Sequence, residues 1–174
     1  MQRPFRLPWP SIILVLCFAF STQTISQESK SPLVVFLVRH AEKANTSLDA
    51  PLTPDGIARA HTLATTLRDA DITEIHSSDY QRTRDTASPL AKLLSLPVQL
   101  YDPRELSPLV AMLTEKGGRH LVVGHSNTTP SLAKLLGGAS GSAINEKEEF
   151  DRLYIITIDP KGSTTTVLLR YGTP

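Results

Sequence analysis

Short apolar runs and stretches of helical periodicity alternate along most of the chain. The run Leu33–Val38 is rich in β-branched residues, as is typical of a strand covered on both faces. Thr53-Pro54 then provides a helix start, and apolar residues follow it at helical spacing, at Ile57, Ala60, Ala64 and Leu67. The pattern repeats. Strands are predicted at 33–38, 72–77, 98–101 and 121–124, and helices are predicted to start near 53, 78, 106 and 129.

The C-terminal part of the chain has a different pattern. Leu153–Ile158 and Thr164–Tyr171 flank Asp159-Pro160-Lys161-Gly162, which predicts a β-hairpin. Four strand–helix pairs followed by a hairpin indicate an α/β fold. We expect a three-layer sandwich with a mostly parallel sheet, helices on both faces and an antiparallel C-terminal hairpin at its edge.

The first thirty residues have the features of a targeting segment. Two arginines precede an apolar run of nine residues at 12–20, which is too short for a bilayer span of roughly 20 residues. We therefore expect a signal peptide over residues 1–26, cleaved after Ser21 or Ser26, and export to the periplasm or the extracellular space. An uncleaved membrane anchor is the alternative.

Composition narrows the possible functions. A chain of 174 residues fits one domain, and 18 Lys and Arg residues against 17 Asp and Glu residues leave a net charge of only +1. No basic excess favours nucleic acid, and the single cysteine, Cys17, excludes an internal disulfide. The sequence contains no His-x-x-Glu-His or clustered Asp pattern, so we expect no metal site and no cofactor. The sequence contains no feature that predicts the oligomeric state.

Basic side chains and imidazoles follow three of the predicted strands. Arg39 and His40 end the first strand, His125 follows the strand at 121–124, and Arg82 and Arg84 come shortly after the strand at 72–77. Each alone is compatible with a solvated surface group. Together they indicate an anion site, because ligands of such sheets bind at the carboxyl ends of the strands. The remaining histidines are interpreted as structural: His61, His76 and His120.

Four ordered segments resemble motifs of the histidine phosphatase superfamily, also called the phosphoglycerate-mutase-like family. Val38–Glu42 resembles its RHG motif, with Ala41 in place of the usual glycine, and Leu52–Gly56 resembles the helix entry that follows it. Ser77–Ala87 resembles the second-arginine motif, and Val123–Asn127 the second-histidine motif. The resemblance covers roughly residues 33–172 of a domain expected at 32–174, and it implies a short-branch member with little room for a lid.

The resemblance implies a role for each candidate residue. His40 would be the nucleophile that forms a phosphohistidine, with its second ring nitrogen held as a donor by a backbone carbonyl. Arg39, Arg82 and His125, the last as an imidazolium, would neutralise the phosphoryl oxygens. Glu105 is the best positional match for the proton donor. Further substrate-binding candidates are Ser126, Asn127 and Asn45. Arg82 is chosen over Arg84, which points about 200° away around the helix.

The implied activity is metal-independent hydrolysis of a phosphorylated small molecule or phosphoprotein, with neither nucleic acid nor, after signal cleavage, a membrane as partner. Two alternatives share the same fold, namely a phosphomutase and a non-catalytic phospho-ligand-binding module. A serine hydrolase is a third alternative, because Gly124-His125-Ser126 resembles a nucleophile elbow. That fold needs a histidine after the serine in chain order, and no histidine follows residue 125.

Overall fold

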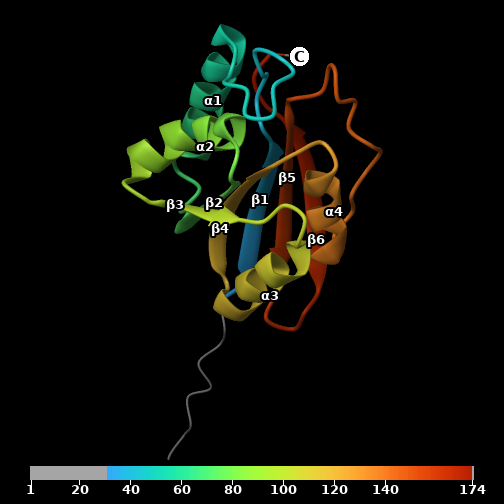
Figure 1. Ribbon diagram of the computed structural model, residues 1–174. Helices are drawn as coiled ribbons and strands as arrows, with labels where there is room; N and C mark the ends of the chain where they lie inside the picture. Colours follow the sequence, from blue (N-terminus) through green and yellow to red (C-terminus); the bar gives the residue numbers. More distant parts are fainter. Residues whose placement is uncertain (1–30, 174) are drawn as a thin grey trace, which may run out of the picture.

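A six-stranded mixed sheet is the middle layer of the computed structural model, which describes residues 31–173 (Figure 1). The strands are β1 Leu33–Arg39, β2 Glu74–Ser78, β3 Val98–Tyr101, β4 Gly118–Gly124, β5 Arg152–Ile158 and β6 Thr164–Arg170. The helices are α1 Pro54–Leu67, α2 Gln81–Leu94, α3 Leu106–Lys116 and α4 Thr128–Leu135. The expected signal peptide lies outside the described residues. Within 31–173 no helix is long and apolar enough to cross a membrane.

The strand order is β3-β2-β4-β1-β5-β6. β1 to β4 run parallel, β5 is antiparallel to β1, and β6 is antiparallel to β5. The predicted fold class, with its antiparallel C-terminal hairpin at one edge, is therefore confirmed. β1 lies between β4 and β5, and all seven of its residues are buried. The carboxyl end of β1 therefore lies near the middle of the edge at which the parallel strands end.

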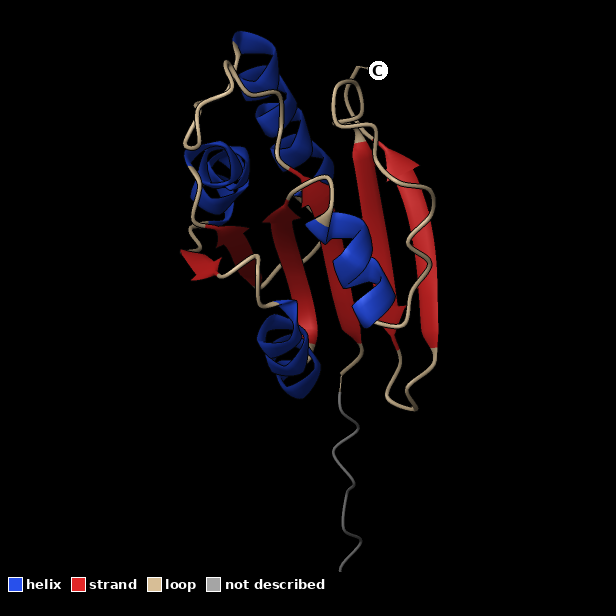
Figure 2. Cartoon of the chain, turned by 45° about the vertical axis from the view of Figure 1, so that its right-hand side comes forward, coloured by secondary structure: helices blue, strands red, loops and turns tan. Residues whose placement is uncertain are grey.

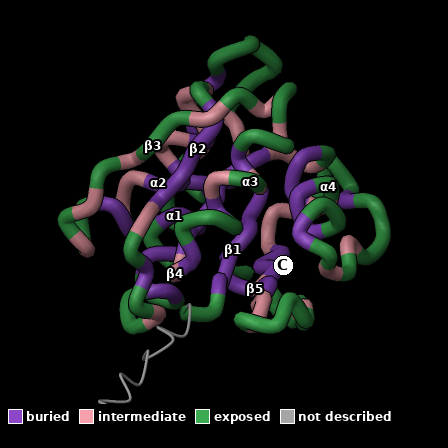
Figure 3. Tube along the Cα trace, turned by 90° about the horizontal axis from the view of Figure 1, so that it is seen from below, coloured by how far each residue is buried: buried purple, intermediate pink, exposed green. Residues whose placement is uncertain are grey.

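Helices cover both faces of the sheet (Figure 2). Val34, Phe36 and Val38 face a core shared with α1 and α2, whereas Leu33, Val35 and Leu37 face a core shared with α3 and α4. The alternation follows from the two-residue repeat of a strand, and it explains why this run is apolar throughout. Figure 3 shows that the buried residues lie along the central strands, whereas exposed segments connect these strands.

The apolar face predicted for α1 differs in one detail from the observed face. Ile57 is 51% exposed, and Arg59 is buried instead. The Arg59 guanidinium donates to Glu42 Oε1 at 2.8 Å and to the carbonyl oxygens of Tyr171 at 3.0 Å and Thr173 at 2.8 Å. A paired cation can be buried where an isolated one cannot. Arg59 thereby fastens the segment after β1 to the C-terminal end of the chain.

The start of α1 also holds the segment after β1. The Thr53 hydroxyl accepts a hydrogen bond from the Gly56 amide at 2.9 Å, and the Thr53 amide donates to the Glu42 carbonyl at 2.9 Å. A Cβ atom at Gly56 would collide with the Glu42 carbonyl oxygen and lie 3.1 Å from the Glu42 amide nitrogen. Glycine is required at this position because the backbone of the segment after His40 passes too close for a side chain.

Gly56→Ala should lower the midpoint of thermal unfolding. In an ordinary helix interior this change is stabilising by about 1 kcal/mol, but here the added methyl group must displace the Glu42 backbone. Circular dichroism melting of the variant measures the effect. Asp55→Ala, one residue earlier and exposed, is the matched control and should change the midpoint little. A Gly56→Ala protein as stable as the wild type would contradict the close approach.

Candidate active site

The carboxyl ends of β1, β2 and β4 meet around a cavity of about 310 Å³. His40 follows β1, His125 follows β4, and Arg82 lies in the first turn of α2. Of the residues predicted for the site, the cavity is lined by His40, Arg82, His125, Ser126 and Asn127. Arg39, Asn45 and Glu105 do not line it. The folded chain thus gathers residues from three strand ends that lie far apart in the sequence.

His40 is held rigidly beneath the cavity. The ring is 4% exposed, and its Nδ1 lies 2.7 Å from the carbonyl oxygen of Ala41. Because a carbonyl can only accept, Nδ1 carries the proton and Nε2 keeps its lone pair. The Ala41 amide in turn donates to the Thr86 hydroxyl at 3.0 Å, and the His40 amide donates to the Gly124 carbonyl at 2.9 Å. These bonds fix the ring orientation and leave Nε2 as the reactive nitrogen.

The surroundings of His40 keep its imidazole neutral. Burial lowers its pKa to about 3, and the charges of Arg39, His125 and Arg82 act in the same direction. The hydrogen bond to Ala41 opposes them only in part. A neutral ring is the form that can attack an electrophile, so at neutral pH His40 is in its nucleophilic state.

Arg82 faces the cavity, whereas Arg84 does not. The Arg82 guanidinium lies over the Tyr80 ring at 4.4 Å and donates from Nη1 to the Leu48 carbonyl at 2.7 Å. Arg84 instead pairs with Asp79 and, at 3.7 Å, with Asp49 on the surface. This arrangement agrees with the choice of Arg82 from the sequence motif.

His125 is the second imidazole of the site. Its ring centroid lies 5.4 Å from that of His40, and its Nε2 is 2.8 Å from the Ser78 hydroxyl. Burial lowers the pKa of His125 to about 4, with further lowering by the charges of Arg82, Arg39 and Lys43. The ring is therefore neutral at neutral pH. The imidazolium expected from the sequence would form only beside an anion, whose charge would raise this pKa.

Arg39 has a different environment from the one expected. It is 1% exposed, and its terminal nitrogens donate to the backbone carbonyls of Asn145 at 3.3 Å, Glu149 at 2.9 Å and Glu146 at 2.7 Å. The guanidinium also stacks on Phe150 at 4.0 Å. Burial lowers the pKa of Arg39 to about 10, which still leaves it charged at neutral pH. Arg39 thus anchors the segment 145–150 beside the site.

Each of the two arginines nevertheless keeps one unused donor. Within residues 31–173, the Nε atoms of Arg39 and Arg82 are buried and have no hydrogen-bond partner. Buried N–H groups are nearly always paired, and a charged one is especially costly to leave unpaired. A pair of spare guanidinium donors on the residues next to His40 and His125 therefore fits an oxyanion.

The segment anchored by Arg39 brings an unexpected carboxyl group to the site. Glu146 lines the same cavity as His40. No motif singles it out, because Glu146-Lys147-Glu148-Glu149 is a run of charged residues of the kind that is usually solvated. Lys43 and Arg104 also line the cavity and were not predicted. Arg104 is paired with Asp102 at 2.7 Å, so it is Lys43 that adds positive charge beside His40 and Arg82, which favours anionic ligands.

The predicted residues Glu105 and Asn45 lie elsewhere. Glu105 is exposed at the N-cap of α3 and lines a separate cavity, together with His76 and Leu109. Asn45 is exposed, and its side-chain oxygen accepts a hydrogen bond from the Ser47 amide at 2.8 Å in a local turn. Neither side chain belongs to the cavity that contains His40.

Comparisons with known proteins agree with this geometry. Residues 35–105, which include the His40 and Arg82 segments, match the sequence model of the histidine phosphatase superfamily (branch 1). The chain is 40% identical over 79 residues to the probable phosphoglycerate mutase GpmB of Yersinia pestis (strain Pestoides F), and equally to that of Yersinia pseudotuberculosis serotype O:1b (strain IP 31758). The match covers 41% of this chain but only 36% of either relative's length.

Solved structures share the whole fold. The protein histidine phosphatase SixA, complexed with tungstate, aligns with a TM-score of 0.63 at 21% identity, covering 79% of this chain and 97% of SixA. A phosphoglycerate mutase from Bacillus anthracis str. Sterne aligns with a TM-score of 0.61 at 16% identity, covering 81% and 94% of the two chains. The match of residues 35–105 and the shared fold confirm the resemblance to the histidine phosphatase superfamily that the motifs show.

Proposed function

We propose that this protein is a phosphatase that hydrolyses phosphomonoesters or phosphorylated side chains through a phosphohistidine at His40. One observation carries the proposal. A neutral imidazole, with Nδ1 tied to the Ala41 carbonyl, lies among Arg39, Arg82 and His125, and both arginines have a spare buried donor. A nucleophilic nitrogen among fixed cationic donors matches the needs of phosphoryl transfer.

The proposed reaction has two displacements at phosphorus. His40 Nε2 attacks, the bond from phosphorus to the ester oxygen breaks, and that oxygen leaves after taking a proton from the Glu146 carboxyl group, which regains it from the attacking water in the second displacement. Water then attacks the phosphohistidine, which releases inorganic phosphate and restores the neutral ring. Arg82 and the Arg39 Nε–H stabilise the negative charge on the phosphoryl oxygens, and His125 becomes a donor as the anion raises its pKa. These groups supply the positive charge that a metal ion provides in other phosphatases.

The substrate class is proposed from the surroundings of the cavity. Lys43 extends the positive lining beyond the catalytic residues and favours a substrate with further negative charge. The fold is shared with a protein histidine phosphatase whose structure holds tungstate, a tetrahedral oxyanion. We therefore place a phosphohistidine peptide beside small phosphomonoesters among the substrates to be assayed.

A phosphomutase is the second candidate, because the 79-residue match is to probable phosphoglycerate mutases. The two activities share the phosphohistidine and differ in its fate. Release of inorganic phosphate in step with substrate loss supports hydrolysis. Return of the phosphoryl group to another position of the sugar acid, without release of phosphate, supports a mutase.

His40→Ala should abolish turnover and leave the fold intact, because no other group at the site is a neutral nucleophile held by the same hydrogen bond. In the wild type, a substrate with a labelled phosphoryl group should give an acid-labile, base-stable phosphoenzyme after rapid quenching. The control is His61→Ala, which changes an exposed histidine of α1 and should keep full activity. Label recovered on Ser126 would overturn the assignment and favour a serine hydrolase.

Arg82→Ala should lower kcat/KM by about 10²–10³-fold, the range seen when a transition-state donor is removed. Arg84→Ala should be nearly neutral, because Arg84 pairs with Asp79 and Asp49 away from the cavity. Steady-state kinetics on one substrate compare the two variants directly, with circular dichroism to confirm folding. The opposite ranking would show that Arg84 is the phosphate ligand.

The proton donor can be identified by comparing Glu146→Gln with Glu105→Gln. General acid catalysis contributes about 10²–10⁴-fold, and only a poor leaving group needs it. Glu146→Gln should slow phosphorylation of His40 strongly with an alkyl phosphate and weakly with p-nitrophenyl phosphate. Glu105→Gln should have little effect, because Glu105 lines a different cavity.

This comparison requires pre-steady-state measurement, because loss of the same carboxyl group can also slow hydrolysis of the phosphohistidine. A strong, leaving-group-dependent loss in Glu105→Gln would restore the assignment made from the sequence. Equal losses with both substrates in Glu146→Gln would indicate that Glu146 contributes to binding and not to proton transfer.

A further inference from the structure

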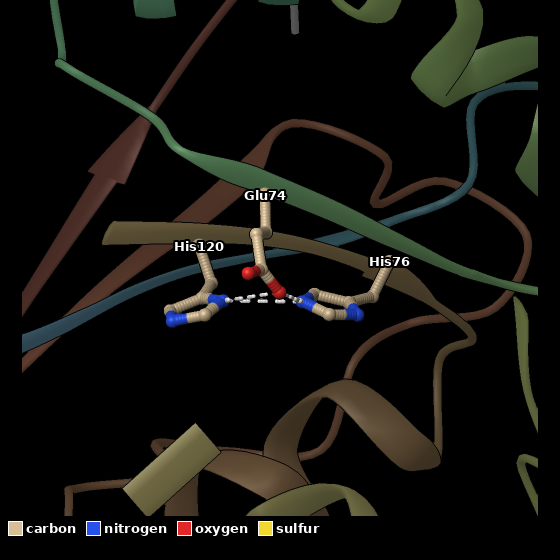
Figure 4. A group of neighbouring side chains, drawn as sticks. All are labelled: Glu74, His76 and His120. Carbon is tan, nitrogen blue, oxygen red and sulfur yellow. Dashed lines mark hydrogen bonds and ion pairs between the residues drawn. The ribbon is translucent and has the colours of Figure 1, made fainter. Parts of the chain in front are cut away.

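A second cluster of titratable side chains lies at the other end of the sheet. Glu74 and His76 are two residues apart on β2, and His120 on β4 is the register partner of Glu74, so all three side chains project from one face. Figure 4 shows them pointing toward one another. His120 and His76 are buried, and the Glu74 side chain is 12% exposed. Nothing in the proposed phosphatase reaction uses this cluster.

The three possible ligand atoms have the spacing of a metal's coordination shell. His76 Nε2 lies 3.1 Å from His120 Nδ1, and Glu74 Oε2 lies 3.6 Å from the first and 3.8 Å from the second. Ligands bound tetrahedrally to Zn²⁺ at its usual distances are about 3.3 Å apart. The observed triangle is therefore close to one face of a zinc tetrahedron.

Each of the three atoms has one hydrogen-bond partner. His120 Nε2 donates to the Gly117 carbonyl at 2.7 Å, so His120 Nδ1 keeps its lone pair and accepts from His76 Nε2. Glu74 Oε2 accepts from Gln99 and lies beyond hydrogen-bond distance of both ring nitrogens. The two rings and the carboxylate therefore converge with a single proton, on His76 Nε2, between them, and a cation can take the place of that proton.

The surroundings resemble the outer shell of a metal site. A ligating histidine typically donates its other nitrogen to a backbone carbonyl, as His120 does to Gly117. Gln99 donates to Glu74 Oε2 at 3.2 Å, and Lys116 pairs with the other carboxylate oxygen. Burial alone would raise the pKa of Glu74, but Lys116 outweighs it and lowers that pKa, which keeps the carboxylate ionised.

A cavity beside the cluster gives access to it. This cavity of about 320 Å³ is lined by His76 and Gln99 from the sheet and by Leu109 and Met112 from α3. It can admit an ion and leave a coordination position for water.

We propose that Glu74, His76 and His120 bind one divalent transition-metal ion, with Zn²⁺ the best match to two imidazoles and a carboxylate. Binding moves the His76 proton from Nε2 to Nδ1, and the ion takes Nε2, His120 Nδ1 and Glu74 Oε2, with water as a fourth ligand. The site links Glu74 and His76 of β2 to His120 in the amino-terminal half of β4, whereas His40 follows the carboxyl end of β1. The role of the metal site is therefore to stabilise the fold and not to assist phosphoryl transfer.

The experiment is a Zn²⁺ titration of chelator-treated full-length protein against a chromophoric competitor, combined with thermal unfolding. One equivalent should bind, and the unfolding midpoint should rise by about 5–10 °C when free Zn²⁺ exceeds Kd by 100-fold. His76→Gln and His120→Gln should each weaken binding by about 100-fold or more, since loss of an outer-shell partner alone costs 10–100-fold. His61→Gln, at an exposed histidine of α1, should bind as the wild type does.

Two further variants keep the test decisive. Glu74→Gln should also lose Zn²⁺, and it carries the test if His120→Gln fails to fold without metal. His40→Ala should keep the zinc, because its ring belongs to the other cavity. Binding that is lost in His40→Ala, or that survives in both His76→Gln and Glu74→Gln, would overturn the proposal, as would the absence of a tight site in the wild type. Phosphatase activity in EDTA is assayed separately, so a failed zinc site leaves the proposed reaction intact.

Discussion

Burial of a guanidinium at the end of the central strand is the constraint on which this site depends. Arg39 is 1% exposed, and a charge in that position must be compensated by acceptors. The compensation comes from three backbone carbonyls in the segment 145–149, more than a hundred residues further along the chain. That segment is therefore drawn over the carboxyl end of β1, and it carries Glu146 to the cavity.

The same concentration of positive charge sets the protonation of the imidazoles. His40 and His125 are buried beside Arg39 and Arg82, and both pKa values lie well below the usual value for histidine. The arrangement suits two roles: His40 must be neutral before the substrate arrives, and His125 becomes a charged hydrogen-bond donor once the phosphate is bound. Binding of an anion and protonation of His125 are thus coupled.

The sequence by itself determined the elements and several of the residues that line the cavity with His40. Apolar runs and helical spacing located the strands and helices because each element buries one continuous face, and the bounds of β3 and the start of α3 are those predicted. Thr53 and Pro54 marked the start of α1 through a local hydrogen bond. His40 and His125 each come directly after a predicted strand. Parallel strands bring their carboxyl ends to the same edge of the sheet, so the two residues could be placed together without knowing the conformation of the loops. Local chemistry and topology sufficed for these residues.

Only the tertiary structure decided which other side chains join each cluster. Glu105 and Glu146 are both glutamates in polar segments, and the pairing of Arg39 with distant carbonyls, which no local pattern encodes, brings Glu146 to the cavity. Likewise His76 and His120 are 44 residues apart, and they meet Glu74 because β2 pairs with β4 in one particular register. Shifting that register by one residue would turn the two histidines to opposite faces of the sheet. Contacts of this kind depend on how the elements pack against one another. The pattern of apolar and polar residues within a single element does not reveal them.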